Sequence, residues 1–575
     1  MLQNQDIQVE LAGAKKINLE VAKLIQSQDS PFAVDKQEIN GIEYKVFSNL
    51  PVSLPAMYKS VVEVHGNNEF LVYQNERYSF NDVYKKATDF ALGLEQQFNI
   101  KKGDRIVIAM RNYPEWIMAF MAITSLGAVV VPLNAWWQNE EFEYGINHCE
   151  AKLVIADQKR FDLLKSFLTK NSISAIVARE EGIVDSAHTM SSILTQFENS
   201  PSKVRNINAE DTASIFYTSG STGEPKGAVS NHRSILSALN TWTLLGTGAA
   251  FANGTAGQEP AFRPCALMTV PLFHVTACHV LFLLSLFTGR KTVMMHKWDA
   301  QEALRLIECE RVTYFNGVPT MSMEIMQHPN IKQFDTSSLL DISAGGAPRP
   351  ADHVRQLYEK FAKGHASTGY GLTETNALGA VNHSGDYLAR PNSVGTPTFP
   401  IVEMIILDAS GNILVDGEQG EIAIKSISNV SSYFKNEQAT EEAFVDGYFK
   451  TGDLGYLDSE GFVYIVDRVK DIIIRGGENI SCAEVEEAIY KCGLVQECSV
   501  FALPDERLGE IVGAAIFPKQ NKSIDIEQLQ DFLFKHLAGF KVPAKVFVTD
   551  TPLPRLGSGK LNKKFMKRHY SMANN

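Results

Sequence analysis

The chain has 575 residues, which is too long for one compact hydrophobic core, so roughly two to four structural units are expected. Apolar residues make up 45% of it and charged residues 21%, and 54 basic against 66 acidic residues give a net charge of −12. These values are typical of a globular protein, and the negative balance argues against a nucleic-acid-binding or anionic-membrane-binding surface.

The N-terminal residues, the most apolar stretch and the cysteines indicate in which cellular compartment the protein is expected. The N-terminal 16 residues contain no apolar run after a basic start, so a signal peptide is not expected. The most apolar stretch, residues 280–287, is much shorter than the roughly 20 residues of a membrane-spanning helix. We expect a cytoplasmic protein without a transmembrane segment; peripheral membrane contact and a homodimer stay open. The seven cysteines have no CxxC spacing and are expected to be reduced thiols: Cys149, Cys265, Cys278, Cys309, Cys482, Cys492 and Cys498.

The first half of the chain alternates between predicted strands and helices. Residues 1–50 are expected to form an N-terminal leader with some amphipathic helix, before the body begins near Pro51. Short apolar runs predict buried strands at residues 105–110, 128–131, 153–156 and 175–178, with a helix over residues 116–126. Continuous apolar runs separated by helices indicate doubly wound parallel sheets that are covered on both faces.

The second half predicts two further units. Short strands at residues 402–407, 420–425 and 462–466 lie between Gly and Asp turns, which indicates a β-rich subdomain at about residues 396–468. From residue 471 a small α+β unit follows. The expected fold is therefore α/β, with a large domain over residues 51–468 and a small C-terminal domain over residues 469–575. The glycine-rich segment 246–257 is expected to be a flexible loop.

A loop rich in glycine and hydroxyl groups runs from Tyr217 to Gly227, between a predicted strand at residues 213–216 and a predicted helix from residue 231 or 232. Such a turn exposes backbone N–H groups and hydroxyls that can surround phosphate oxygens, and Lys226 adds a compact positive charge. It is not a Walker A loop, because Lys226 stands between Pro225 and Gly227. Composition alone would also fit an ordinary surface loop.

The order of residues in this loop closely resembles the signature of the adenylate-forming (ANL) superfamily, in its acyl-CoA synthetase or fatty-acid–CoA ligase branch. Four further motifs follow in that family's order and extend the resemblance over roughly residues 60–565: Ser343–Pro348, Tyr370–Thr375, Tyr448–Asp453 with Asp467-Arg468, and Pro552–Leu561. The resemblance implies an AMP-binding domain over residues 51–468 and a mobile C-terminal domain over residues 469–575, joined by a hinge at Lys470.

The resemblance also implies roles for individual residues. Lys560, Thr218 and Glu374 would be catalytic, and Thr218 and Glu374 would hold Mg²⁺, which prefers a carboxylate together with phosphate oxygens. The nucleotide would bind to Thr218, Ser219, Gly220, Ser221, Thr222, Gly223, Lys226, Gly345, Gly346, Ala347, Pro348, Tyr370, Gly371, Thr373, Asp453, Arg468 and Lys560.

The chemistry of three of these residues suits the roles. A carboxylate such as Asp453 can accept both vicinal hydroxyls of ribose. A lysine such as Lys560 can bridge the acid's carboxylate and the α-phosphate, two anions that otherwise repel each other. Taken alone, Asp453, Arg468 and Lys560 would be assigned as surface charges, and only their place in the motif series favours function.

The acyl group of the adenylate is predicted to be transferred to CoA. His274 stands where amino-acid-activating domains of the family carry an acidic residue, and no carrier region follows Lys560. No insertion precedes the segment with Gly476, Gly477 and Glu478, which the resemblance assigns to CoA binding. The cofactors and co-substrates implied are ATP, Mg²⁺ and CoA.

The acyl pocket is predicted at His274, Val275, Thr276, Cys278 and Gly317, although core packing explains Val275 and Cys278 equally well. This pocket is expected to be apolar and without a charge partner. The predicted activity is an ATP-dependent acid–CoA ligase that forms an acyl-adenylate and then an acyl-CoA thioester, with a medium- or long-chain fatty acid. The alternatives are an aryl-acid–CoA ligase, an acyl-AMP ligase that serves a separate carrier protein, a luciferase-like oxygenase, and a non-catalytic nucleotide-binding homologue.

Overall fold

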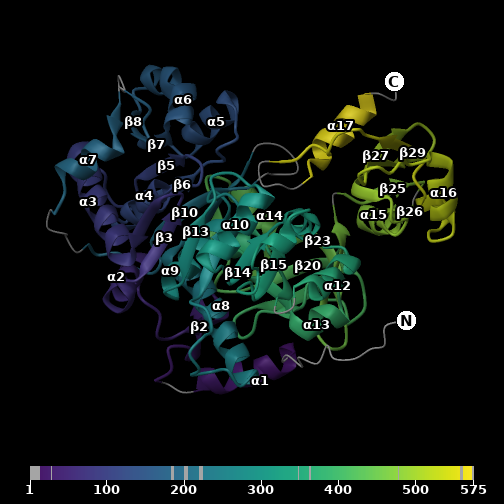
Figure 1. Ribbon diagram of the computed structural model, residues 1–575, viewed down its shortest axis with the longest axis horizontal. Coiled ribbons are helices and arrows are strands. Elements are labelled where there is room, and N and C mark those ends of the chain that lie inside the picture. The colour runs from purple at the N-terminus through teal and green to yellow at the C-terminus, as the bar shows by residue number, and fades with distance from the viewer. Residues whose placement is uncertain are drawn as a thin grey trace.

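A computed structural model describes residues 13–26, 29–182, 187–199, 205–218, 225–347, 349–361, 364–469, 471–476, 478–556 and 561–572 of the chain (Figure 1). Two large sheets, a smaller β-sheet and a C-terminal α+β domain follow one another along these residues. The C-terminal domain lies to one side of the two large sheets in Figure 1.

The first large sheet has eight strands in the order β21-β11-β10-β6-β5-β7-β8-β9, and its central strands are parallel. Alternate side chains of these strands enter two separate hydrophobic clusters, one on each face. This arrangement confirms the predicted parallel sheet with both faces covered. Its elements are β5 (Arg105–Ala109), β6 (Val129–Pro132), β7 (Leu153–Asp157), β8 (Ser174–Ala178), β9 (His188–Thr189), β10 (Thr212–Tyr217), β11 (Gly227–Asn231), β21 (Ser432–Tyr433), α5 (Asn139–His148), α6 (Gln158–Lys170) and α7 (Met190–Gln196).

The second large sheet has nine strands in the order β18-β17-β16-β15-β14-β12-β13-β3-β4. Its elements are β3 (Glu69–Tyr73), β4 (Glu76–Ser79), β12 (Cys265–Met268), β13 (Lys291–Met294), β14 (Tyr314–Gly317), β15 (Asp341–Gly345), β16 (His365–Gly371), β17 (Gly379–His383), β18 (Thr396–Pro397), α10 (Ala300–Glu310), α11 (Pro319–Gln327), α12 (Ala351–Lys360) and α13 (Ser384–Ala389). Parallel pairing of β3, β12, β13, β14, β15 and β16 brings the carboxyl ends of these strands to one edge of the sheet.

The two sheets share the largest hydrophobic core of the described residues. Helix α4 is buried on nearly every side, because it lies within this core rather than on the surface. Its Trp116 and Phe120 make edge-to-face contacts with Phe282, at centroid distances of 6.4 and 5.6 Å. The helices of this layer are α2 (Leu54–His65), α3 (Phe80–Phe98), α4 (Pro114–Ser125), the π-helix η1 (Thr276–Leu283) and α9 (Leu284–Phe287).

The β-rich unit predicted after Gly395 is a five-stranded sheet in the order β19-β20-β23-β22, with β24 paired to β23. The C-terminal unit is a second five-stranded sheet with helices. The elements of these two units are β19 (Glu403–Leu407), β20 (Gly420–Lys425), α14 (Glu437–Ala443), β22 (Phe444–Val445), β23 (Tyr448–Leu457) and β24 (Val463–Arg468), then β25 (Ile473–Arg475), β26 (Glu478–Ile480), α15 (Cys482–Tyr490), β27 (Val495–Asp505), β28 (Gly509–Pro518), α16 (Ile526–Phe534), β29 (Lys545–Val548) and α17 (Lys563–Met572).

The predicted flexible loop at residues 246–257 is wrong in its first half. Helix α8 (His232–Ala252) continues through Gly246 and Gly248, and α1 (Ala14–Gln26) packs against it at the lower edge of Figure 1. Ile17 and Val21 of α1 are buried in this contact, so tertiary packing outweighs the low helix propensity of glycine. A short hairpin, β1 (Val34–Ile39) and β2 (Ile42–Phe47), follows α1.

Helix α8 is long and apolar enough to cross a membrane, alone among the helices of the described ranges. However, 56% of its most apolar window is buried inside the protein, between α1 and the interior of the N-terminal domain. Its apolar character is therefore that of a core helix.

Candidate active site

The predicted phosphate loop joins two antiparallel strands, β10 and β11, in which Tyr217 pairs with Gly227. The Thr218 N–H donates to the Lys226 carbonyl at 2.9 Å, which fixes both ends of the loop. The predicted residues Ser219, Gly220, Ser221, Thr222 and Gly223 lie outside the described residues. Thr218 and Lys226 line a large cavity that opens at the carboxyl ends of the parallel strands of the second sheet.

Glu374 lies in the same cavity and is buried. The Tyr433 hydroxyl donates to its Oε1 at 2.8 Å, and the Lys226 ammonium lies 4.9 Å from the centre of the Tyr433 ring. Burial raises the pKa of the Glu374 carboxyl, while the Tyr433 hydrogen bond and the charges of Arg468 and Lys226 oppose this shift. Among the described residues Glu374 forms no ion pair, so its carboxylate fits a divalent cation that also takes phosphate oxygens.

The predicted ribose site brings together three segments that are distant in the sequence. Asp453 on β23 and Arg468 on β24 are register partners, and Arg468 Nε lies 2.9 Å from Asp453 Oδ1. The Tyr370 hydroxyl at the end of β16 donates to Asp453 Oδ2 at 2.7 Å. The Asp453 side chain is 5% exposed and that of Arg468 is 56% exposed, so the carboxylate is fixed while the guanidinium reaches the cavity.

The predicted adenine turn follows β15 at the same edge of the sheet. Gly345, Gly346 and Ala347 line the cavity, and Gly346 has φ of +75°, a conformation that glycine adopts without strain. Gly371 and Thr373 line the cavity as well. Gly371 has no room for a side chain, because an added Cβ would lie 2.4 Å from the Ala377 carbonyl oxygen. Pro348 lies outside the described residues.

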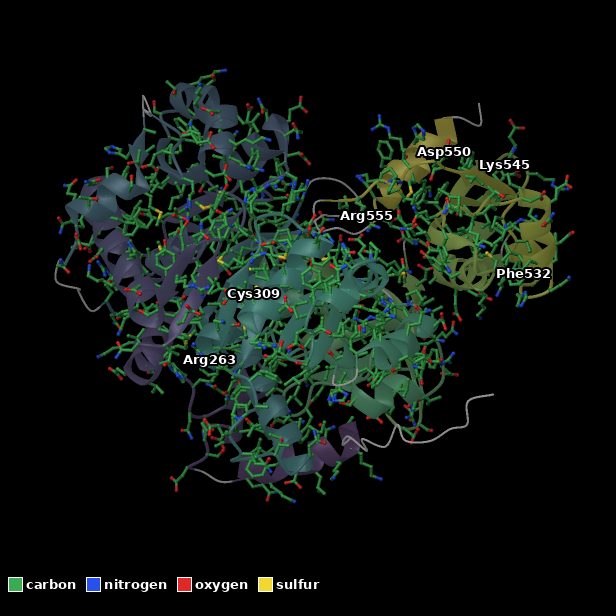
Figure 2. All side chains as sticks on the ribbon, in the orientation of Figure 1. Arg263, Cys309, Phe532, Lys545, Asp550 and Arg555 are labelled. Atoms are coloured by element: carbon green, nitrogen blue, oxygen red, sulfur yellow. The ribbon has the colours of Figure 1, made fainter. Side chains whose placement is uncertain are left out.

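The C-terminal domain contributes described residues to the cavity on either side of the predicted catalytic lysine. Leu556 and Leu561 line it, whereas Lys560 itself lies outside the described residues. Arg555, between the two parts of the molecule in Figure 2, pairs with Glu497 at 2.6 Å and donates to Thr320 Oγ1 of α11 at 3.5 Å.

Of the predicted CoA segment, the structure describes Gly476 and Glu478. Gly476 donates its N–H to the Leu508 carbonyl at 2.8 Å, and Glu478 opens β26 at the surface. Neither residue is among the described residues that line the cavity. Gly477 and the predicted hinge Lys470 lie outside the described residues.

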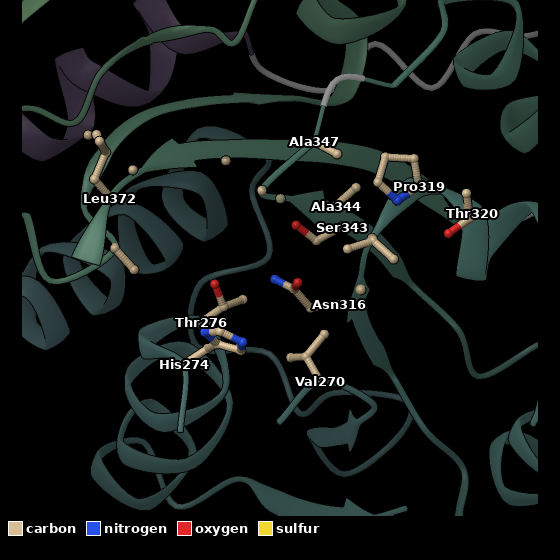
Figure 3. A pocket seen from close by; sticks show the side chains of 18 of the residues that line it. Val270, His274, Thr276, Asn316, Pro319, Thr320, Ser343, Ala344, Ala347 and Leu372 are labelled. Carbon is tan, nitrogen blue, oxygen red and sulfur yellow. The ribbon is translucent and has the colours of Figure 1, made fainter. Parts of the chain in front are cut away.

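The cavity has a volume of about 1760 Å³ and extends from the nucleotide site into the second sheet. Four residues that were predicted for the acyl pocket line this cavity, namely His274, Val275, Thr276 and Gly317. In Figure 3 the Asn316 amide lies between Ser343 on one side and His274 with Thr276 on the other. Cys278 does not belong to the lining: it is fully buried in the hydrophobic core, where it neighbours Tyr58.

The prediction of an apolar pocket without a charge partner is also wrong. Polar and charged side chains of the second sheet and of the turn before β13 line the cavity, namely Arg290, Tyr314, Asn316, Asp341, Ser343, His365 and Ser367. The sequence contained a signal for most of them. Residues 314–316, 341–344 and 365–367 alternate polar and apolar side chains, the pattern of strands with one face against an open or polar space.

Comparison with known families decides the assignment of this site. A family model described as AMP-binding enzyme matches residues 58–434, and a second, described as AMP-binding enzyme C-terminal domain, matches residues 484–560. The chain belongs to the adenylate-forming AMP-binding enzymes. The first match alone covers more than half of the chain.

Relatives of this AMP-binding enzyme are named for different acids. A long-chain-fatty-acid–CoA ligase of Bacillus subtilis is 30% identical over 514 residues, covering 85% of this chain and 89% of the relative. A feruloyl-CoA synthase of Amycolatopsis sp. is 31% identical over 495 residues, covering 86% and 94%. The structure of o-succinylbenzoate coenzyme A synthetase from Bacillus subtilis, in complex with ATP and magnesium ion, has a TM-score of 0.74 at 26% identity and covers 88% and 98%. The enzyme is an AMP-forming acid–CoA ligase that uses ATP, Mg²⁺ and CoA.

Proposed function

We propose that this ligase activates an acid with an extended body, in the first place a medium- or long-chain fatty acid, and that an aryl acid is the alternative. The observation that supports it is the long cavity behind the nucleotide site. One side of that cavity is an apolar helical wall formed by Trp242, Leu245 and Ala249 of α8, Val280 of η1 and Leu284 of α9. Such a wall favours an acyl chain or an aromatic ring over a short polar acid.

The residues around the nucleotide site would fix ATP for the first step. Asp453, held by Tyr370 and Arg468, would accept the ribose hydroxyls, and Lys226 would face the phosphates. Thr218 and Glu374 would hold Mg²⁺, which supplies charge neutralisation for the phosphates when it is bound. These groups would orient the α-phosphate for in-line attack without reorganising during the reaction.

The reaction would then take two steps. A carboxylate oxygen of the acid attacks the α-phosphorus of ATP, an acyl–phosphate bond forms and pyrophosphate leaves. The thiolate of CoA next attacks the acyl carbonyl carbon, a thioester forms and AMP leaves. Lys560 would bridge the carboxylate and the α-phosphate in the first step, and Gly476, Gly477 and Glu478 would meet CoA in the second. Because both segments belong to the C-terminal domain, the domain would rotate between the steps.

The role of Lys560 can be tested by separating the half-reactions. Lys560→Ala is expected to lower acyl-AMP formation at least about 100-fold, because the charge that offsets two repelling anions is lost. Thioester formation from supplied acyl-AMP should stay within about threefold of wild type, because the adenylate is already made. The matched control is Lys522→Ala, an exposed lysine of the same domain, which should leave both rates unchanged. Equal loss of both half-reactions in Lys560→Ala would contradict the assigned role.

Screening for the acid uses pyrophosphate and AMP release with fatty, aryl and short acids, with and without CoA. AMP release that requires CoA supports the proposal. Acyl-AMP that accumulates equally with and without CoA would indicate an acyl-AMP ligase for a separate carrier protein.

The proposed location of the enzyme is the cytoplasm. All seven cysteines are unpaired, which supports this location.

A further inference from the structure

One face of the second sheet forms a polar surface on one side of the cavity. Tyr314, Asp341 and His365 are register partners at the amino ends of β14, β15 and β16, and Asn316, Ser343 and Ser367 form the next row on the same face. All six line the cavity, and we call them the polar sheet face. The intervening residues, such as Ile342 and Ala366, point into the hydrophobic core instead.

The charged end of this face is far from the nucleotide. Along β15, Asp341 and Gly345 are separated by four residue steps, which corresponds to about 13 Å in a β-strand. The turn at the predicted nucleotide site begins at Gly345, so the row of Tyr314, Asp341 and His365 lies at the other end of these strands, within the same cavity. An acid whose carboxylate meets the α-phosphate would place its other end against this row.

Arg290 brings a positive charge to the same end. Its Nε donates to Ser285 Oγ at 2.8 Å and its Nη2 donates to the Val280 carbonyl at 3.0 Å. Its guanidinium carbon lies 4.8 Å from the centre of the Tyr314 ring. Nη1 has no hydrogen-bond partner among the described residues, and Arg290 forms no ion pair with any of them. A donor is therefore left available where Arg290 lines the cavity.

Asp341 offers an acceptor beside it. The Ser367 hydroxyl donates to Asp341 Oδ1 at 2.6 Å. Oδ2 has no partner within the part of the chain that the structure describes, and no cation is within ion-pair distance. Because Tyr314 and Asp341 are register partners, the guanidinium over the Tyr314 ring and the Asp341 carboxylate belong to one corner of the cavity. This donor and this acceptor therefore both face the cavity and are available to one ligand group.

We propose that the acid carries a hydroxyl group at the end opposite its carboxylate, and that this hydroxyl accepts a hydrogen bond from Arg290 and donates one to Asp341. The inference rests on the proposed acid–CoA ligase activity and narrows its substrate class to hydroxylated acids. A hydroxyl is both donor and acceptor, so it satisfies both groups at once. A methyl or ring-hydrogen terminus satisfies neither, and a second carboxylate would accept from Arg290 but would face the like charge of Asp341.

The test compares acids that differ only at the far end. For a chain body these are decanoate, 10-hydroxydecanoate and decanedioate, and for an aromatic body they are cinnamate, 4-hydroxycinnamate and 4-carboxycinnamate. The measurement is kcat/KM for CoA-dependent AMP release by the full-length wild-type enzyme. In at least one series the hydroxy acid is expected to exceed both analogues about tenfold or more, because a site built for a hydroxyl discriminates strongly against acids without it.

Variants of Arg290 and Asp341 then test whether these residues cause the preference for the hydroxy acid. Arg290→Leu should bring the ratio of hydroxy acid to unsubstituted acid to within about twofold of unity, and Arg290→Lys, which keeps a donor, should retain part of it. The control is Arg355→Leu, an exposed arginine of α12, which should keep the wild-type ratio. If Arg290→Leu fails to fold, Asp341→Ala gives a second test and should likewise lower the ratio.

The outcomes separate this inference from the function on which it rests. CoA-dependent AMP release without a hydroxyl preference in either series would overturn the inference and leave the ligase proposal standing. Greater activity with decanedioate or 4-carboxycinnamate would overturn it in favour of a dicarboxylic acid. An unchanged ratio in Arg290→Leu would refute the assigned binding site. If no acid of either series gives CoA-dependent AMP release, the proposed extended-acid substrate fails, and this inference fails with it.

Discussion

The Asp341 carboxyl lines the cavity, and among the described residues only its Oδ1 has a hydrogen-bond partner. Burial raises the pKa of its carboxyl to about 6, and the Ser367 hydrogen bond and the positive charges of Arg349 and Arg290 only partly offset this shift. Between the ordinary pKa of 3.8 and about 6, the folded state holds a proton that the unfolded state has already lost. This residue's contribution to stability therefore falls as pH rises through that window.

Replacing Asp341 should remove this dependence. The quantity to follow is the difference in free energy of unfolding between wild type and Asp341→Asn. As pH rises from 4 to 7, this difference is expected to shift against wild type by up to about 3 kcal/mol, the limit set by the pKa shift. Urea denaturation at a series of pH values measures the difference. Asp352→Asn, at an exposed position of α12, serves as the control and should follow the wild-type curve. Parallel curves for wild type and Asp341→Asn would show that the carboxyl titrates normally.

Local motifs predict which residues form the ribose site, whereas no local motif marks the residues of the polar sheet face. Tyr370, Asp453 and Arg468 were predicted from local motifs, and the register of β23 and β24 explains how residues 15 positions apart meet. Arg290 and Asp341 carry no motif, because their significance depends on which strands are neighbours and which face is open. Parallel order among β13, β14 and β15 is a tertiary property that a local pattern does not fix.

At the scale of elements, the helix–strand alternation of the first half and the α+β order of the C-terminal domain follow from hydrophobic patterning. The last part of helix α8 did not, because Gly246 and Gly248 are typical loop residues. Gly248 has a structural reason to be glycine in a helix: an added Cβ would lie 2.6 Å from Val21 Cγ2 of α1. The glycine thus permits close approach of two helices, and α1 covers the side of α8 around Gly248.

Two alanine substitutions on α8 should have opposite effects. Gly246→Ala meets nothing within 4 Å of the new Cβ and should stabilise the protein by about 0.5–1 kcal/mol through helix propensity. Gly248→Ala gains the same propensity but forces Val21 or α1 to move, and should destabilise by about 1 kcal/mol or more. Thermal and urea unfolding measure both. An equal stabilisation by the two variants would mean that α1 does not pack against Gly248 in solution.

At the scale of the whole molecule, the C-terminal domain is hydrogen-bonded to the large domain close to the predicted hinge. Asp467 at the end of β24 accepts hydrogen bonds from the backbone N–H groups of Cys482 and Ala483 at the start of α15, and the Ser481 hydroxyl donates to the Val466 carbonyl at 2.9 Å. Farther from the hinge, Arg555 contacts Thr320. The domain's fold could be predicted from the sequence, whereas its contacts with the large domain could not, because the same surfaces would serve more than one arrangement.

Restricting the backbone at Lys470 should separate the two half-reactions. Proline fixes φ near −65° and removes an N–H, so Lys470→Pro is expected to slow thioester formation at least about tenfold by hindering rotation of the domain. Adenylate formation, followed as pyrophosphate release in the first turnover, should stay within about threefold of wild type, because residues 555, 556 and 561 already meet the cavity without that rotation. Lys470→Ala removes the same charge but leaves φ free, and it should behave as wild type in both steps. Normal thioester turnover by Lys470→Pro would place the hinge elsewhere, and equal impairment by Lys470→Ala would show that the side chain rather than the backbone matters.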